Sequence, residues 1–129
     1  MSEVSELLAG LPLFAGCPRR EVERVARFAH EERFEAGESL VQEGERGDRF
    51  YVLVEGSVAV EQGGAVVRTL GPGDFFGEIA LIAHANRTAS VRTTAPVRAV
   101  VLPARDFRAV IGRFPAVTDA VVTAIAARA

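Results

Sequence analysis

Hydrophobic residues recur with two different periods along this chain. In residues 18–29 they follow the three-and-four spacing of an amphipathic helix. The residues with this spacing are Val22, Val25, Ala26 and Ala29. From about Glu32 to Pro103 the spacing changes to short apolar runs separated by turn residues, and after Pro103 the helical spacing returns. This order predicts a mainly β structure with flanking helices.

The central segment has the pattern of an antiparallel sheet structure. Glycine-containing turns arrive mostly seven to nine residues apart, and the runs between them are rich in Val, Leu, Phe and Tyr. These runs are 39–41, 50–54, 58–61, 66–70, 90–94 and 97–102. Short strands at near-even spacing are typical of sandwiches and barrels, and we predict an antiparallel β-jelly roll, also called a double-stranded β-helix.

We expect one domain over residues 1–129, with helices at both of its ends. Its predicted parts are an N-terminal helical segment (1–31), the jelly roll (32–103) and C-terminal helices (104–129). Pro18 is suited to the first position of the amphipathic helix, because that position needs no backbone N–H. At the other end, we expect one helix over 106–114 and a second, alanine-rich helix over 117–129.

Several acidic residues stand at predicted turns. Asp48 and Asp74 each precede aromatic residues, and we interpret both as turn residues, because a short carboxylate accepts hydrogen bonds from nearby backbone. Glu43 and Glu45 flank Gly44 in the same kind of position. The sequence offers these two acids no recognisable partner for acid–base catalysis.

Composition excludes several kinds of function. No apolar run approaches the roughly 20 residues of a membrane helix, and no signal-peptide pattern begins the chain, so we expect a cytoplasmic protein. Cys17 is the only cysteine, which suits a reducing compartment. A net charge of -2 argues against a nucleic-acid surface. All 15 basic residues are arginine, so lysine Schiff-base chemistry and Walker-type phosphate binding are excluded.

Residues 76–91 carry the pattern of an anion site. Gly77 allows close approach of backbone N–H groups, and the helical turn expected from Glu78 to Ile82 adds unpaired donors. Arg87 supplies a planar, permanently charged group suited to phosphate oxygens. With about half a positive charge from the helix terminus, one from Arg87 and one negative charge on Glu78, the sum suits a singly charged anion with a hydroxyl for Glu78. A cyclic phosphodiester on a ribose meets that description.

This stretch resembles the phosphate-binding cassette of the cyclic nucleotide-binding domain family. The family includes bacterial catabolite activator proteins, regulatory subunits of cyclic-nucleotide-dependent kinases and cyclic-nucleotide-gated channels. The resemblance rests on Gly77-Glu78-x-Ala80-Leu81, then five residues, then Arg87-Thr88-Ala89-x-Val91. A second block is also similar: Leu40-Val41-x-Glu43-Gly44-Glu45-x-Gly47-Asp48-x-Phe50-Tyr51-Val52-Leu53-Val54-Glu55-Gly56.

The resemblance implies a ligand-binding site in the cassette. Its residues would be Gly77, Glu78, Ile79, Ala80, Arg87, Thr88 and Ala89. Arg87 would pair with the cyclic phosphate, and Glu78 would accept a hydrogen bond from the ribose 2′-hydroxyl. In the family a threonine after the phosphate arginine accompanies guanine recognition in some members and adenine in others, so the resemblance implies cAMP as ligand with cGMP as the alternative.

The resemblance also implies a regulatory or sensor role rather than an enzyme. In this family the C-terminal helix moves when ligand binds and often covers the base. No aromatic residue follows Phe114, so an aliphatic cap from Val121, Val122 or Ile125 is the candidate here. The signal would pass to a protein effector or to a larger regulated chain, whereas nucleic acid is not an expected partner.

Two other functions fit parts of the sequence. A ligand-free protein-interaction module would keep the fold as a scaffold. A jelly-roll metalloenzyme would need several histidines with carboxylates, and the chain has only His30 and His84.

Overall fold

The computed structural model describes residues 3–78 and 85–128. Its N-terminal part contains helix α1 (Glu3–Ala9), the 3-10 turn η1 (Pro12–Phe14) and helix α2 (Arg19–Ala26). Pro18 is the N-cap of α2, with an extended ψ of 138°, and not its first helical residue as predicted. Helix α2 ends before Ala29, because the backbone N–H groups of residues 27–29 bond three residues back and turn the chain toward the first strand.

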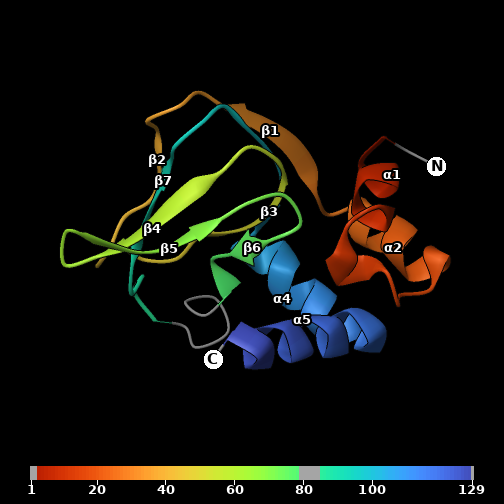
Figure 1. Ribbon diagram of the computed structural model, residues 1–129. Helices are drawn as coiled ribbons and strands as arrows, with labels where there is room; N and C mark the ends of the chain where they lie inside the picture. The colour runs from red at the N-terminus through yellow and green to blue at the C-terminus, as the bar shows by residue number, and fades with distance from the viewer. Residues whose placement is uncertain (1–2, 79–84, 129) are drawn as a thin grey trace.

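Two four-stranded antiparallel sheets form the centre (Figure 1). One has the order β1-β8-β3-β6 and the other the order β2-β7-β4-β5. The strands are β1 (His30–Phe34), β2 (Ser39–Val41), β3 (Arg49–Glu55), β4 (Val58–Gln62), β5 (Ala65–Leu70), β6 (Phe75–Phe76), β7 (Ser90–Thr93) and β8 (Val97–Pro103). This arrangement confirms the predicted jelly roll. The six predicted runs lie within a residue or two of six strands, but β1 and the two-residue strand β6 were not among them. Strand β1 was missed because its sequence HEERF is mostly polar.

Strand β3 is buried on both faces, and its alternate residues enter two separate hydrophobic cores. Tyr51 and Leu53 point into the core between the two sheets. Phe50 and Val52 point into the core that the helices share with the outer face of the same sheet. Strand β8 pairs with β3 and divides its residues in the same way, which explains why both strands read as continuous apolar runs.

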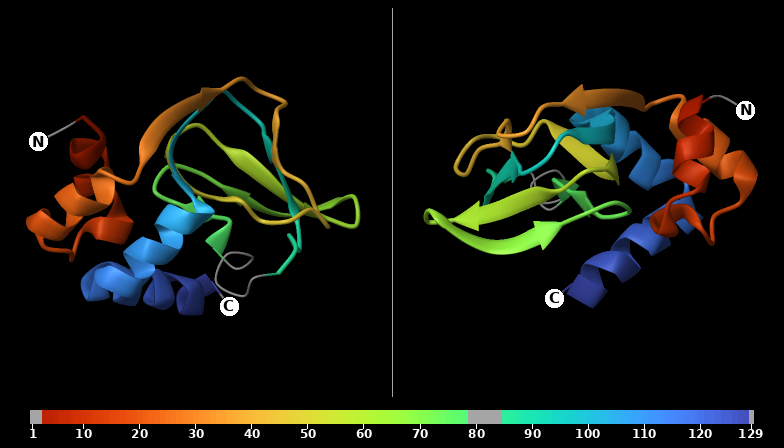
Figure 2. Two further views of the ribbon diagram at one scale, coloured as in Figure 1. Left: turned by 180° about the vertical axis from the view of Figure 1, so that it is seen from behind. Right: turned by 45° about the horizontal axis from the view of Figure 1, so that its top comes forward.

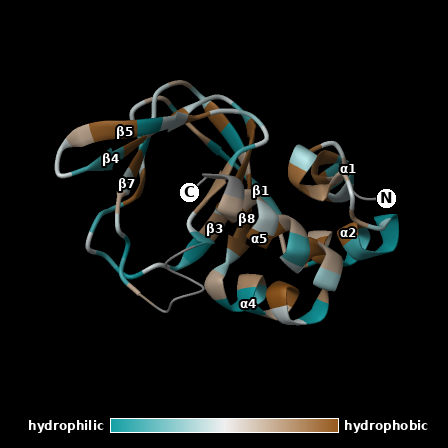
Figure 3. Cartoon of the chain, turned by 60° about the horizontal axis from the view of Figure 1, so that its bottom comes forward, coloured by the Kyte–Doolittle hydropathy of each residue, from teal (hydrophilic) through white to brown (hydrophobic). Residues whose placement is uncertain are grey.

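The C-terminal helices α4 (Ala104–Arg113) and α5 (Pro115–Arg128) complete the helical side of the molecule. Figure 2 shows the helices gathered on one side, away from the tip of the β4–β5 hairpin. Hydrophobic segments are visible on the C-terminal helices in Figure 3, and side chains of α4 and α5 share one core with side chains of β3 and β8. The ring of Phe107 on α4 lies 4.7 Å from that of Phe50 on β3. Helix α5 contacts α4 and η1.

The candidate cap residues on α5 differ in burial. Val121 is 2% exposed and belongs to the helical core, so in this arrangement it is a packing residue. Ile125 packs against the same core, whereas Val122 is 57% exposed.

In the described ranges, no single helix has the length and apolar character needed to span a membrane. Helices α4 and α5 together reach that length and composition, but they meet at a bend of 109°.

Gly56, in the turn from β3 to β4, gives a test of the packing. Its φ is +92°, and an added Cβ would lie 2.2 Å from the Pro96 carbonyl oxygen and 2.9 Å from Val97 Cα. We expect Gly56→Ala to lower the free energy of unfolding by about 3 kcal/mol or more, measured by urea denaturation.

Gly37 is the matched control, because its φ is +84° and an added Cβ there meets nothing within 4 Å. Gly37→Ala should cost about 1 kcal/mol. Equal losses of unfolding free energy in Gly56→Ala and Gly37→Ala would contradict the packing described.

Candidate functional site

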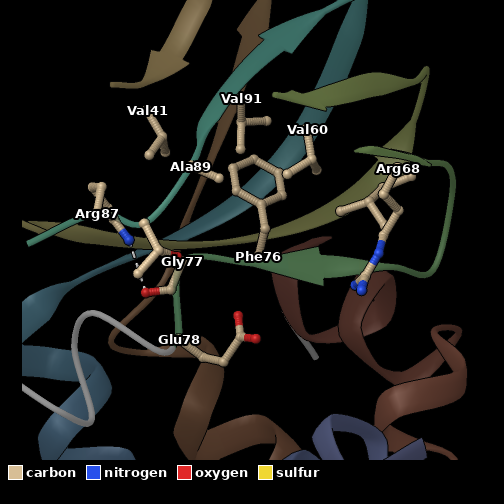
Figure 4. A pocket seen from close by; sticks show the side chains of 11 residues that line it. Val41, Val60, Arg68, Phe76, Gly77, Glu78, Arg87, Ala89 and Val91 are labelled. Carbon is tan, nitrogen blue, oxygen red and sulfur yellow. Dashed lines mark hydrogen bonds between the residues drawn. The ribbon is translucent and has the colours of Figure 1, made fainter. Parts of the chain in front are cut away.

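A pocket opens at the end of the β6 strand, where cassette residues meet the second sheet (Figure 4). Strands β2, β4, β5, β6 and β7 all contribute to it. The lining residues are Val41, Val60, Arg68, Leu70, Phe76, Gly77, Glu78, Arg87, Thr88, Ala89 and Val91. The pocket therefore joins a charged end, built from the cassette, to an apolar wall built from the strands.

Arg87 is the central cation of the charged end. Its side chain is buried, and its Nη1 donates to the Gly77 carbonyl oxygen at 2.8 Å. Its Nη2 donates to the Arg49 carbonyl oxygen at 2.7 Å and lies 3.8 Å from Asp48 Oδ1. Burial lowers the pKa of Arg87, and the nearby Asp48, Tyr51 and Glu78 oppose that shift. A guanidinium nevertheless stays protonated in proteins, so the pocket contains a fixed positive charge.

Asp48 differs from its predicted role. Its carboxylate is 80% exposed and pairs at long range with Arg87, while its main-chain oxygen accepts from Ala104 N, at the start of α4, at 2.8 Å. Asp74 does behave as a turn residue, because its Oδ2 accepts from Gly71 N at 2.9 Å. Only the second of the two turn predictions is therefore supported by a side-chain hydrogen bond.

The backbone on the Arg87 side of the pocket is held from two directions. Gly44 N donates to the Arg87 oxygen at 2.9 Å, and Arg87 N donates to the Glu45 oxygen at 2.7 Å. From the other direction, Gln62 Nε2 at the end of β4 donates to the Thr88 oxygen at 3.1 Å. The side chain of Glu43 accepts from Gly63 N at 3.2 Å, so this acid joins the β2–β3 turn to the β4–β5 hairpin. These hydrogen bonds hold the segment in place.

Gly77 allows the carbonyl contacts of Arg87 to form. Its φ is +98°, and an added Cβ would lie 2.6 Å from the Arg49 carbonyl oxygen and 3.1 Å from Arg87 Nη1. Any side chain there would displace the guanidinium or its acceptor. The next residue, Glu78, is 3% exposed and lines the pocket.

Most of the sequence-predicted site residues meet in this pocket. Gly77, Glu78, Arg87, Thr88 and Ala89 all line it. Ile79 and Ala80, and the helical turn expected after Glu78, lie outside the described residues, as does His84.

The apolar wall and Arg68 were not predicted as site residues. The wall includes Val60, Leu70, Phe76 and Val91. Phe76 is itself held by stacking on Tyr51, with ring centroids 4.7 Å apart and an interplanar angle of 12°. Strand alternation could have placed these side chains on one face, but it could not have shown which strands surround the cassette.

Across residues 3–78 and 85–128, no group of three or more His, Cys, Asp or Glu side chains could hold a metal ion. Arg87 and the apolar wall instead suit an anion attached to a hydrophobic, ring-containing group.

Comparison with known sequences gives this arrangement a family. Residues 31–114 match the family described as the cyclic nucleotide-binding domain. The chain belongs to the cyclic nucleotide-binding domain family. The match covers all the strands except the first residue of β1, and it extends to the end of α4.

Three similar proteins illustrate the range of this family. A Rhodopseudomonas palustris protein, named a "putative potassium channel protein", is 33% identical over 115 residues, which are 86% of this chain. The solved regulatory domain of Toxoplasma gondii PKA with cAMP has a TM-score of 0.82 at 29% identity and covers 98% of the chain. The catabolite activator protein of Thermus thermophilus has a TM-score of 0.81 at 28% identity and covers 91%.

The matched regions are parts of longer proteins. This chain spans 28% of the R. palustris protein, 49% of the T. gondii chain and 57% of the T. thermophilus chain. The similarity therefore accounts for only part of the length of each of these relatives.

Arg87→Ala tests whether the guanidinium contributes to the stability of the protein without ligand. The change leaves the carbonyl oxygens of Gly77 and Arg49 without their charged donors, so we expect the free energy of unfolding to fall by about 1–3 kcal/mol. Urea denaturation would measure the loss. Arg92→Ala, on the exposed side of β7, is the matched control and should change stability by less than about 0.5 kcal/mol. A variant as stable as the parent would show that the carbonyl contacts contribute little.

Proposed function

We propose that this chain is a sensor module that binds a purine nucleoside 3′,5′-cyclic monophosphate, cAMP or cGMP. The observation that supports this most directly is that Gly77, Glu78 and Arg87 line one pocket together with an apolar wall. The T. gondii structure, which is described as containing cAMP, makes cAMP the first ligand to test. The role is regulatory and not catalytic.

Arg87 is the proposed phosphate ligand. A guanidinium has five N–H donors, and the contacts with Gly77 and Arg49 use two of them, from different Nη atoms. The remaining donors are available to a phosphate oxygen while the carbonyl contacts hold the group in place. Among the residues that the structure describes, Asp48 is the acid that forms an ion pair with Arg87, and a phosphate at Arg87 would displace its exposed carboxylate from this 3.8 Å contact.

Glu78 is the proposed ribose ligand. It follows Gly77 directly, so a phosphate at Arg87 brings the adjoining sugar close to it. A carboxylate accepts a hydrogen bond from a hydroxyl but repels a second phosphate, which favours a singly charged cyclic diester over a nucleoside triphosphate.

We further propose that ligand binding is relayed to the C-terminal helices. Asp48 connects the two regions, because its carboxylate lies near Arg87 and its main-chain oxygen accepts from the first residue of α4. A ligand that displaces the Asp48 carboxylate from Arg87 would therefore alter a residue that contacts the base of α4. The receiver would be a protein effector or the rest of a larger regulated chain, and a cytoplasmic location would suit the single cysteine.

Calorimetry with cAMP, cGMP and 5′-AMP tests the binding proposal. We expect micromolar or tighter binding of at least one cyclic ligand. Binding of 5′-AMP should be weak, because its phosphate monoester carries more negative charge and lacks the cyclic phosphodiester ring. Arg87→Ala should weaken binding ten- to a hundredfold, since hydrogen bonds to charged groups contribute roughly 1.5–3 kcal/mol each. A cyclic ligand at 100 times its Kd should also stabilise the fold by about 2.7 kcal/mol.

The ribose contact has its own control. The parent should bind 2′-deoxy-cAMP more weakly than cAMP by about tenfold or more, whereas Glu78→Gln should lose most of that discrimination. If no cyclic nucleotide changes the melting temperature at saturation, the chain is a ligand-free interaction module and the proposal is wrong.

Amide hydrogen exchange over residues 104–128 tests the relay. Ligand should change the protection of α4 and α5 relative to the free protein, because a ligand shifts a conformational equilibrium by its differential affinity. Asp48→Ala should bind ligand but show a smaller change in those helices. Identical protection with and without ligand would count against the relay while leaving binding intact.

A further inference from the structure

Three arginines surround a second cavity, on the helical side of the molecule. Arg24 lies in the last turn of α2, Arg27 is the C-cap of that helix, and Arg113 is the last residue of α4. Together with Phe28 and Phe114 they line a cavity of about 500 Å³. Figure 1 shows α2 and the junction of α4 with α5 at the same end of the molecule, opposite the tip of the β4–β5 hairpin.

The three guanidinium groups have no acidic partner. All three residues are exposed, and within residues 3–78 and 85–128 none of them forms an ion pair or donates a side-chain hydrogen bond. The described lining of the cavity contains no Asp or Glu. Like charges that converge without an acid repel one another, so an anion placed between them would be stabilising. The cassette pocket differs, because Glu78 offsets the charge of Arg87 there.

A purely structural role is the competing explanation. A cation near the C-terminus of a helix is stabilising, because that end carries a partial negative charge. This explains one arginine at the end of α2 and one at the end of α4. It does not explain why both helix ends direct their arginines to one cavity.

We propose that Arg24, Arg27 and Arg113 bind a diphosphate or triphosphate group, which bridges α2 to the junction of α4 and α5. The planar fork of a guanidinium matches phosphate oxygens, and linked phosphates offer enough oxygens to reach two helices at once. The volume of the cavity is in the range of ordinary small-molecule sites. The cavity shares no described lining residue with the cassette pocket, so this inference does not depend on the proposed function.

The position of Arg113 gives the bridge a structural consequence. Helix α4 ends at Arg113, and α5 begins at Pro115 after a bend of 109°. An anion that holds Arg113 to the end of α2 would restrain this bend. Occupancy of the cavity would therefore stabilise the bent arrangement of the two C-terminal helices.

Calorimetry with inorganic pyrophosphate and tripolyphosphate tests the site, at one fixed ionic strength because salt screens exposed charges. The parent should bind both anions more tightly than orthophosphate or sulfate. Arg24→Gln, Arg27→Gln and Arg113→Gln should each weaken pyrophosphate binding about tenfold or more. ATP without magnesium separates two sources of the same group. Tighter binding of ATP than of tripolyphosphate assigns the site to a nucleotide, and equal binding assigns it to the phosphate chain alone.

Two control variants locate the binding. Arg92→Gln removes an exposed arginine outside the cavity, and Arg87→Ala removes the cation of the cassette pocket. Both should leave pyrophosphate binding unchanged. An equal loss in Arg92→Gln would show general attraction to a basic surface and would overturn the site. A loss in Arg87→Ala with none in the three cavity variants would place the anion in the cassette pocket instead.

The melting temperatures of the ligand-free variants separate the site from the structural role. The proposal predicts that removing one of three converging cations leaves the ligand-free melting temperature unchanged or raises it, while the stabilisation by pyrophosphate is lost. Lower melting temperatures together with unchanged pyrophosphate binding would show a structural role and overturn the proposal. Full binding by Arg113→Gln alone would overturn the bridge to α4, and failure of the parent to bind either anion would overturn the site.

Discussion

Arg87 donates from its two Nη atoms to the carbonyl oxygens of Gly77 and Arg49, and by doing so it joins both ends of the cassette to strand β3. A buried cation is costly unless hydrogen bonds replace its lost water. The two carbonyl oxygens supply those hydrogen bonds and leave the positive charge in place. A carboxylate in close contact would have neutralised it. The pocket therefore keeps a positive charge whose position is set by the backbone.

The carbonyl of Arg49 belongs to β3, which connects the site to both cores. Tyr51, two residues later, stacks on Phe76 in the pocket wall. Phe50, between them, contacts Phe107 of α4 on the opposite face. Because β3 is buried on both faces, it is a rigid support for Arg87 and also a short physical connection between the pocket and the C-terminal helices.

The site was predictable wherever its chemistry is local in sequence. Gly77 and Glu78 are adjacent, and Arg87 with its two following residues forms one short motif, so their types and spacing indicated an anion site. The partners of Arg87 were not predictable, because they are main-chain oxygens, which every residue possesses. Asp48 was interpreted as a turn residue for a related reason: its nearness to Arg87 depends on how the β2–β3 turn packs against the segment before β7. Arg68 was missed because a lone arginine on a strand usually faces water.

Residue periodicity alone established the β-rich centre, the flanking helices and most strand positions, since these follow from which side chains must leave water. It failed at β1, where polar residues pair with the buried strand β8 and only tertiary context makes them a strand. The pairing order of the two sheets, the division of β3 between two cores and the convergence of five strands on one pocket were decided by the tertiary structure. These features depend on contacts between residues distant in the chain, and a linear pattern specifies which faces must be buried but not which partner buries them.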